Sequence, residues 1–187
     1  MGMPETARIW TRADVLALPD DGNRYELVDG ELLVSPSPRP LHQLAVGAFY
    51  DRIKPYVRAS QLGTVLFSPA DLDLRSEQLL QPDLFVLDAE PGRPFREWAD
   101  AGIPRLVVEV LSPSTARFDR ITKRRRYQRS GVPAYWIVDP DARLVEAWRP
   151  ESESPLVVDG TLAWQADEGI PPLLIDLPAC FREIWGE

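Results

Sequence analysis

The segment 105–140 constrains the fold of this chain more than any other, because two strongly apolar runs in it flank a charged stretch. The runs, RLVVEVL and AYWIVDP, are typical of strands at the centre of a sheet that is covered on both faces. Between them, Ser114 or Thr115 can cap a helix that runs to about Ser130 and stops at Gly131. The pattern therefore predicts two central strands separated by a helix.

The other segments predict the rest of a mixed sheet and its helices. Residues 24–35, RYELVDGELLVS, carry Asp-Gly between two apolar runs, which suits a β-hairpin with a two-residue type I′ turn. Residues 41–58 place apolar side chains near one helix face and predict the longest helix, whose last turn can bend at Pro55. Together the elements indicate an α/β (α+β) fold with extra antiparallel strands. Further strands are expected at 64–67, 70–74, 84–88, 143–150, 155–160 and 161–166, and further helical turns at 11–18, 96–101 and 177–185.

Length and composition predict a single globular domain over residues 1–187. No apolar run approaches the roughly 18 residues that a membrane span needs, and the N-terminal sequence lacks the pattern of a secretory signal. The single cysteine, Cys180, cannot form an internal disulfide, so we expect a cytoplasmic protein without a membrane partner. The net charge of −8 disfavours a generic protein that coats nucleic acid. It does not exclude a nuclease, because metal-binding carboxylates add to the negative charge.

Three charged residues carry the strongest functional signal. Asp83 opens an apolar run directly after a proline, Glu109 lies inside the strand VVEVL, and Lys123 follows in the predicted helix. Charged residues are rarely buried unless they are paired or bound to a metal. If the two strands are adjacent, both carboxylates and the backbone carbonyl of Val110 can supply the hard oxygen ligands that Mg²⁺ prefers. Such an ion polarises a phosphoryl oxygen and activates a water, and a nearby lysine stabilises negative charge.

At these positions the chain resembles the PD-(D/E)XK nuclease superfamily, and more closely its Uma-type restriction endonuclease family. The resemblance rests on YELVDGELLV, HQLAV, QPDLFVLD, EVLSPST and GVPAYWIVDP, which occur in the family's order over residues 25–140. It implies a restriction-endonuclease-like fold with Asp83 and Glu109 as ligands of Mg²⁺ or Mn²⁺. One departure concerns the lysine. The usual motif places it two residues after the glutamate, where this chain has Leu111, and the family pattern supplies the amine from the next helix as Lys123.

Each of the three residues also has a purely structural interpretation. Asp83 can cap a turn after Pro82, which is a common role of an isolated aspartate. Glu109 can form a buried salt bridge with an arginine. Lys123 can pair with Asp119 at i, i+4 on the helix surface, where such a contact contributes little. We favour the metal site, because a carboxylate inside an apolar strand needs a strong partner.

Three further residues are candidate accessory groups. Tyr127, one helical turn after Lys123, can hydrogen-bond near the site, although core packing explains it better. His42, the only histidine, can contact a metal-bound water or a phosphate from the start of the long helix, or can simply cap that helix. Glu31, just after the hairpin turn, can approach the metal from the family's early acidic position, or can face solvent as a strand residue.

The helix between the central strands is basic. Seven cations and one acid lie within residues 117–129, and we select Arg120, Arg124, Arg125 and Arg126 as candidates for contacts with nucleic acid. A solvated helix face is an equal alternative, because runs of charge are usually just that.

The leading functional prediction is a metal-dependent endonuclease that hydrolyses phosphodiester bonds of DNA. A duplex needs two cuts, so a symmetric homodimer is expected. The alternative is a catalytically inactive module that binds nucleic acid or a protein partner on the same fold, since function does not follow from fold. A third hypothesis, a small-molecule phosphodiesterase, requires an enclosed pocket instead of an open groove.

Overall fold

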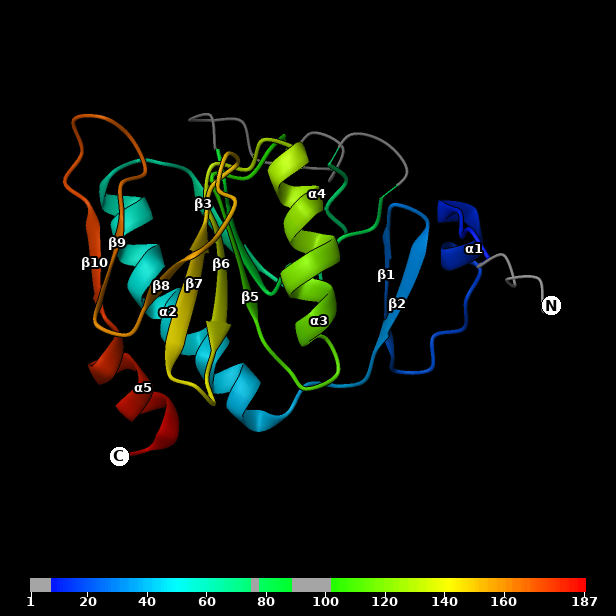
Figure 1. Cartoon of the computed structure of the whole chain (residues 1–187), viewed down its shortest axis with the longest axis horizontal. Helices are drawn as coiled ribbons and strands as arrows, with labels where there is room; N and C mark the ends of the chain where they lie inside the picture. Colours follow the sequence, from blue (N-terminus) through cyan, green and yellow to red (C-terminus); the bar gives the residue numbers. More distant parts are fainter. Residues whose placement is uncertain (1–7, 75–77, 89–101) are drawn as a thin grey trace.

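A computed structural model describes residues 8–74, 78–88 and 102–187, and a six-stranded mixed sheet forms its centre (Figure 1). The strand order is β3–β4–β5–β6–β7–β8, in which β5 and β6 pair in parallel and all other neighbours are antiparallel. The predicted mixed α/β fold is therefore confirmed. The strands are β3 (Thr64–Phe67), β4 (Leu84–Leu87), β5 (Leu106–Val110), β6 (Tyr135–Asp139), β7 (Leu144–Trp148) and β8 (Leu156–Val158).

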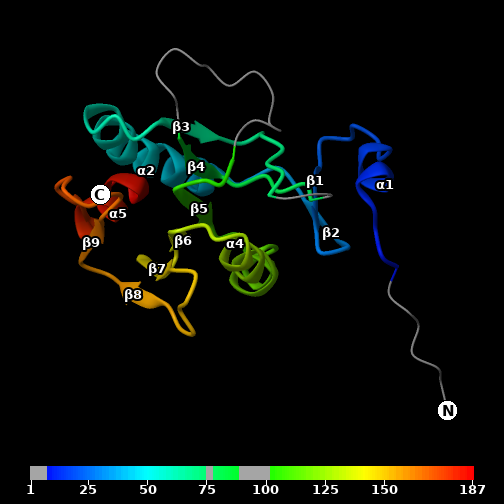
Figure 2. The ribbon, with the colours of Figure 1, turned by 90° about the horizontal axis from the view of Figure 1, so that it is seen from above.

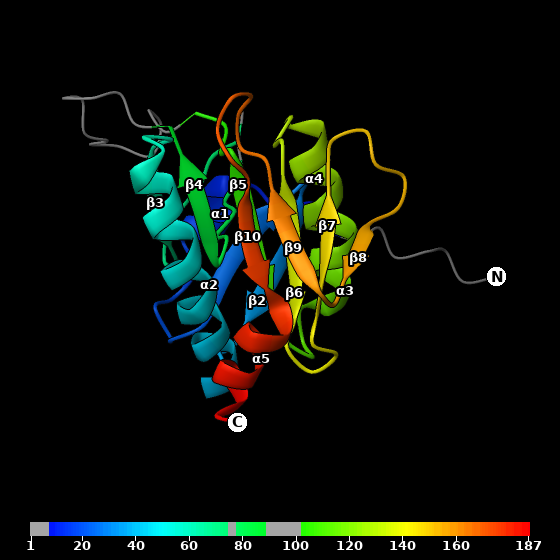
Figure 3. The same ribbon diagram turned by 90° about the vertical axis from the view of Figure 1, so that its left-hand side faces the viewer.

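Helices cover both faces of this sheet, as the views from above and from the side show (Figures 2 and 3). Val108 of β5 packs in the hydrophobic cluster that includes the long helix, whereas Val107 packs in the cluster that includes Tyr127 of the opposite helix. Burial on both faces explains why β5 is apolar at every position except Glu109. One face carries α2 (Pro40–Ala59) and α5 (Leu177–Trp185), and the other carries α3 (Ala116–Phe118), η2 (Asp119–Lys123) and α4 (Arg124–Arg129).

The predicted β-hairpin stands apart from the main sheet, beside α3 and α4 (Figure 1). Its strands β1 (Arg24–Val28) and β2 (Glu31–Ser35) pair in the register that a two-residue turn requires. Asp29 and Gly30 have φ values of 50° and 83°, as a type I′ turn demands. Its connection to the rest of the protein includes backbone hydrogen bonds in both directions between Leu27 and Leu79. The hairpin is thus a separate ribbon that can bring its side chains toward the sheet.

Replacement of Gly30 by alanine is expected to destabilise the protein by about 1–2 kcal/mol. The cause is the positive φ of 83°, which a Cβ disfavours, together with a Cβ position only 2.9 Å from Cγ2 of Ile9. Urea unfolding monitored by circular dichroism measures the change. Gly160→Ala is the matched control, because a Cβ there meets nothing within 4 Å. Equal stability of the two variants would show that the hairpin turn is not under this constraint.

Several local expectations differ from the structure. Residues 70–74 alternate as predicted, with Ala70, Leu72 and Leu74 buried, but they form no strand and make one isolated bridge, to Leu80. An alternating apolar pattern indicates which side chains are buried. A β-strand also needs a neighbouring strand of matching length with which to form a ladder of hydrogen bonds. A terminal antiparallel pair, β9 (Thr161–Trp164) with β10 (Leu173–Asp176), includes one strand, β10, that was not predicted.

The predicted central helix is also less regular than expected. Its middle is a single π-helical turn, η2. The helix begins after Thr115, as predicted, but the side chain of Thr115 makes no capping hydrogen bond. The backbone carbonyl of Ser112 accepts from Ala116 N instead. The expected ending is confirmed, with Gly131 at φ 78°. The helical turn expected at 96–101 lies outside the described residues. Among the helices in the described ranges, none is both long and apolar enough to cross a membrane.

Candidate active site

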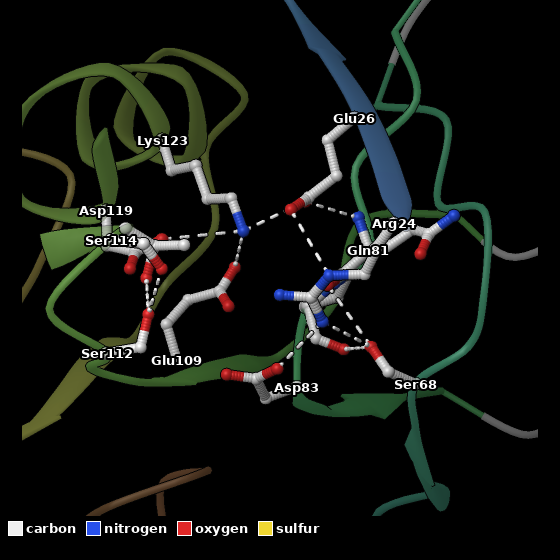
Figure 4. Close-up of polar contacts among 12 residues, drawn as sticks. Arg24, Glu26, Ser68, Gln81, Asp83, Glu109, Ser112, Ser114, Asp119 and Lys123 are labelled. Carbon is white, nitrogen blue, oxygen red and sulfur yellow. Dashed lines mark hydrogen bonds and ion pairs between the residues drawn. The ribbon is translucent and has the colours of Figure 1, made fainter. Parts of the chain in front are cut away.

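The register of β4 and β5 brings Asp83 and Glu109 to one end of neighbouring strands. Leu84 pairs with Val108, and Asp83 and Glu109 take the next positions, so their side chains share the sheet face that α4 covers. Both are buried, with exposed fractions of 3% and 1%. Figure 4 shows the two carboxylates with Lys123 and Glu26 around them. The structure thus brings together the three residues that the sequence analysis selected as catalytic.

Lys123 is the centre of a buried ion-pair network. Its Nζ lies 2.9 Å from Oε1 of Glu26, 3.0 Å from Oε1 of Glu109 and 3.5 Å from Oδ1 of Asp119. The side chain is fully buried, so the expected surface pair with Asp119 exists only as part of this interior cluster. The π-helical turn that spans Asp119 and Lys123 sends both side chains inward, and such turns are frequent at functional sites. Tyr127 OH also donates to Glu109 Oε1, at 3.1 Å.

Asp83 has a different set of partners. Arg24 Nη1 lies 3.0 Å from its Oδ1, and Nε2 of His42 lies 3.1 Å from its Oδ2. The backbone N–H of Val110 donates to the same Oδ2 at 2.9 Å. His42 therefore reaches the carboxylate from the start of α2, while its buried Nδ1 has no hydrogen-bond partner among the described residues. Arg24, His42 and Asp83 also line a cavity of about 820 Å³ that opens above this end of the sheet.

The carboxylates of the cluster differ in acidity. Burial raises the pKa of Glu109 well above its usual range; the charge of Lys123 opposes the shift, and the charge of Asp83 adds to it. Burial likewise raises the pKa of Asp119. Burial alone would raise the pKa of Asp83 too, but the hydrogen bond and attraction of His42 and the charge of Arg24 hold it well below the ordinary value. Asp83 is therefore the carboxylate held most firmly in its ionised form.

The formal charges of the buried cluster around Lys123 and Asp83 do not cancel. When all are ionised, four carboxylates face two permanent cations, so two negative charges remain, which equals the charge of one divalent cation. Oε2 of Glu26 and Oδ1 of Asp119 are buried without a hydrogen-bond partner in the described part of the chain. The carboxylates are Glu26, Asp83, Glu109 and Asp119, and the cations are Arg24 and Lys123.

This donor set fits Mg²⁺ or Mn²⁺. Both ions take hard oxygen ligands, which these carboxylates can supply. Across residues 8–74, 78–88 and 102–187, no group of three His, Cys, Asp or Glu side chains is placed to hold an ion by itself. Mg²⁺ commonly needs only one or two carboxylates, because water and substrate phosphate complete its shell. The pair Asp83 and Glu109 meets that smaller requirement.

Sequence reasoning missed two members of the cluster, Arg24 and Glu26 of β1. Glu26 is fully buried and lies inside an apolar run, which is the signal that singled out Glu109. The acidic residue chosen from this hairpin, Glu31, is instead exposed, and its carboxylate accepts from Thr122 Oγ1 at 3.5 Å. No contact in the described structure joins Glu31 to the cluster. Glu26 and Glu31 share one face of the hairpin, because Glu26 pairs with Leu33 and Val28 pairs with Glu31, but Glu31 lies at the turn end of the ribbon.

The predicted nucleic-acid contacts on the basic helix remain a prediction, and most of these arginines are engaged within the protein. Arg120 pairs with carboxylates of β6 and β7 at 3.1 and 2.7 Å. Arg124 lies over the ring of Trp148, at 4.5 Å, and Arg126 pairs with the hairpin turn at 3.4 Å. Arg125 is exposed. The helix therefore presents less free positive charge than its sequence indicates.

Comparison with protein-family models matches residues 12–178 to Uma2, whose description is "Putative restriction endonuclease". The chain belongs to this family. A comparison with curated proteins gives no match. Among solved structures, a "putative nuclease belonging to DUF820 from Anabaena variabilis ATCC 29413" is similar, with a TM-score of 0.69 and 19% sequence identity. The match covers 94% of this chain and 99% of the other. The likeness confirms the expected restriction-endonuclease-like fold, and the description of Uma2 supports a nuclease function.

The buried hydroxyls and amine around Glu109 predict a loss of stability at alkaline pH. Burial raises the pKa of Tyr127 and of Tyr135 well above 10.0. Burial alone would lower the pKa of Lys123, but the neighbouring carboxylates of Glu109, Glu26 and Asp119 raise it above 10.5. Above about pH 10 the unfolded chain therefore binds fewer protons than the folded protein, and stability falls by up to about 1.4 kcal/mol per pH unit and group. Chemical unfolding between pH 8 and about 11 measures this, and Tyr135→Phe should reduce the slope. A flat profile would contradict the assigned burial.

Proposed function

We propose that this Uma2 protein is a metal-dependent endonuclease that hydrolyses phosphodiester bonds of DNA. The observation that carries the proposal is the buried pair Asp83 and Glu109, with Lys123 beside it, next to a cavity that reaches Asp83. The description of the family is consistent with the same chemistry. A homodimer and a cytoplasmic location remain predictions.

In this proposal Asp83, Glu109 and the carbonyl of Val110 would hold Mg²⁺ or Mn²⁺. When bound, the ion polarises a phosphoryl oxygen and lowers the pKa of a water that attacks phosphorus. Lys123 orients the Glu109 carboxylate through their buried ion pair. Arg24 and His42 orient Asp83 in the same way and face the cavity, where a substrate phosphate would lie. Glu26 positions the ammonium of Lys123.

The test is cleavage of supercoiled plasmid and of circular single-stranded DNA with Mg²⁺, Mn²⁺ or EDTA. We expect cleavage with either ion and none in EDTA. Calorimetry should show binding of the metal to wild type, and an ion that binds only the folded state at 100 times its Kd should stabilise the protein by about 2.7 kcal/mol. No cleavage of either DNA, together with no metal binding, would overturn the proposal. Metal-independent binding of DNA without cleavage would favour the inactive module.

A further inference from the structure

A cavity above Asp83 gives access to this carboxylate in the described part of the chain. It has a volume of about 820 Å³, within the range of pockets that enclose small ligands. Asp83 and His42 lie in its lining, whereas Glu109 and Lys123 do not and are essentially fully buried. A phosphate that reacts at Asp83 can therefore lie in this partly enclosed cavity. Such a cavity suits an unpaired nucleotide, because an unpaired base can leave the stack and pack against side chains of the lining.

The charge of the cavity lining is nearly balanced. Arg24 and Arg39 face three carboxylates, those of Asp20, Asp71 and Asp83. A duplex-binding groove is instead strongly positive, because its affinity comes from neutralised phosphates. The whole chain carries a net charge of −8, and the basic helix is largely neutralised by its own ion pairs. Electrostatic capture of duplex backbone is therefore weak here, and binding must depend on another interaction.

Phe67 supplies such an interaction. It ends the edge strand β3, lines the cavity, and is 55% exposed, which is unusual for a phenylalanine in a strand. Its ring meets Tyr50 edge-on, with centroids 5.4 Å apart. Phe67 pairs with Leu84, so its ring lies on the α2 side of the sheet, whereas the Asp83 side chain points to the α4 side. Both residues line the same cavity at this end of the sheet. Exposed aromatic rings beside a phosphate site are platforms on which unpaired bases stack.

We propose that the substrate is single-stranded DNA, one nucleotide of which enters the cavity, stacks its base on Phe67 and places its phosphate at Asp83, Arg24 and His42. This inference names the substrate class of the proposed nuclease and rests on that function. A single strand needs one cut, so a monomer suffices for the reaction.

Binding measured in EDTA separates the inference from catalysis. A labelled oligonucleotide, alone or annealed to its complement, is titrated with the full chain and followed by fluorescence anisotropy. We expect the single strand to bind at least about tenfold more tightly than the duplex. Phe67→Ala should weaken single-strand binding by roughly 5- to 100-fold, the range found for loss of one stacked base. Salt dependence should be shallow, with a log–log slope of about −1.4 for two phosphate contacts.

Three variants control for changes in fold and for nonspecific binding to exposed apolar side chains. Phe67→Trp should retain or strengthen binding, since the larger ring still stacks, whereas Phe67→Leu should bind as weakly as Phe67→Ala. Leu156→Ala removes an apolar side chain that is 68% exposed from β8, the opposite edge of the sheet, and should leave single-strand binding unchanged. Equal affinity for single strand and duplex, or full affinity in Phe67→Leu, would overturn the inference. Metal-dependent cleavage of duplex in that case would leave the proposed nuclease intact, whereas single-strand binding without cleavage would refute only the nuclease.

Discussion

Replacement of Lys123 by methionine is expected to lower the free energy of unfolding by about 3–5 kcal/mol, the cost of leaving buried charge without its partner. Lys123 is fully buried, and its Nζ contacts Glu26 at 2.9 Å and Glu109 at 3.0 Å. Methionine fills similar space but supplies no charge, so the loss reports the ion pairs and not a cavity. Urea unfolding at neutral pH gives the value, and cleavage should disappear in the same variant.

Arg125→Met is the matched control, because Arg125 is an exposed cation two residues further along the same helical segment. It should change stability by no more than about 0.5 kcal/mol. The double variant Lys123→Met/Glu109→Gln should recover part of the loss, since one unpaired carboxylate is removed. A loss below about 1 kcal/mol in Lys123→Met, or no recovery in the double variant, would show that Lys123 does not hold this cluster together.

Replacement of Glu109 by glutamine is expected to reduce metal-dependent cleavage on the order of 10³-fold while the protein stays at least as stable at pH 7. Burial raises the pKa of Glu109 in the folded protein, so its ionisation costs stability as the pH rises above 4.5, the unfolded value. Glutamine keeps the shape and cannot ionise. The variant should therefore lose activity and lose also the stabilisation that Mg²⁺ gives wild type.

Glu146→Gln is the corresponding control in the same sheet. Glu146 lies on β7 and pairs with Arg120 at 2.7 Å, away from the cavity lining. Cleavage should remain within about twofold of wild type, as for other substitutions remote from the chemistry. Asp83→Asn should behave like Glu109→Gln in activity but not in stability, because the pKa of Asp83 is lowered and its ionised form is stabilising. Full activity in Glu109→Gln would remove this residue from the proposed metal site.

Several features of the fold could be predicted because they depend on neighbouring residues in the chain. Asp29-Gly30 specifies a type I′ turn through backbone sterics, and the apolar runs of β5 and β6 identify strands that are buried on both faces. Where local patterns do not specify a partner, prediction failed. Residues 70–74 have the alternation of a strand but only one bridge, and a π-helical turn at 119–123 interrupts the predicted α-helix.

In the candidate site, too, local sequence predicted the buried charge but not all of its partners. A glutamate inside an apolar strand marks a buried charge, so the sequence by itself determined that Glu109 needs a strong partner. The partners come from distant segments: Lys123 from the next helix, and Glu26 and Arg24 from a hairpin that belongs to a different sheet. Only the docking of that hairpin against the central sheet decided which acidic residue joins the cluster. Docking depends on packing over long sequence separations, whereas composition and periodicity report only the surroundings of each residue.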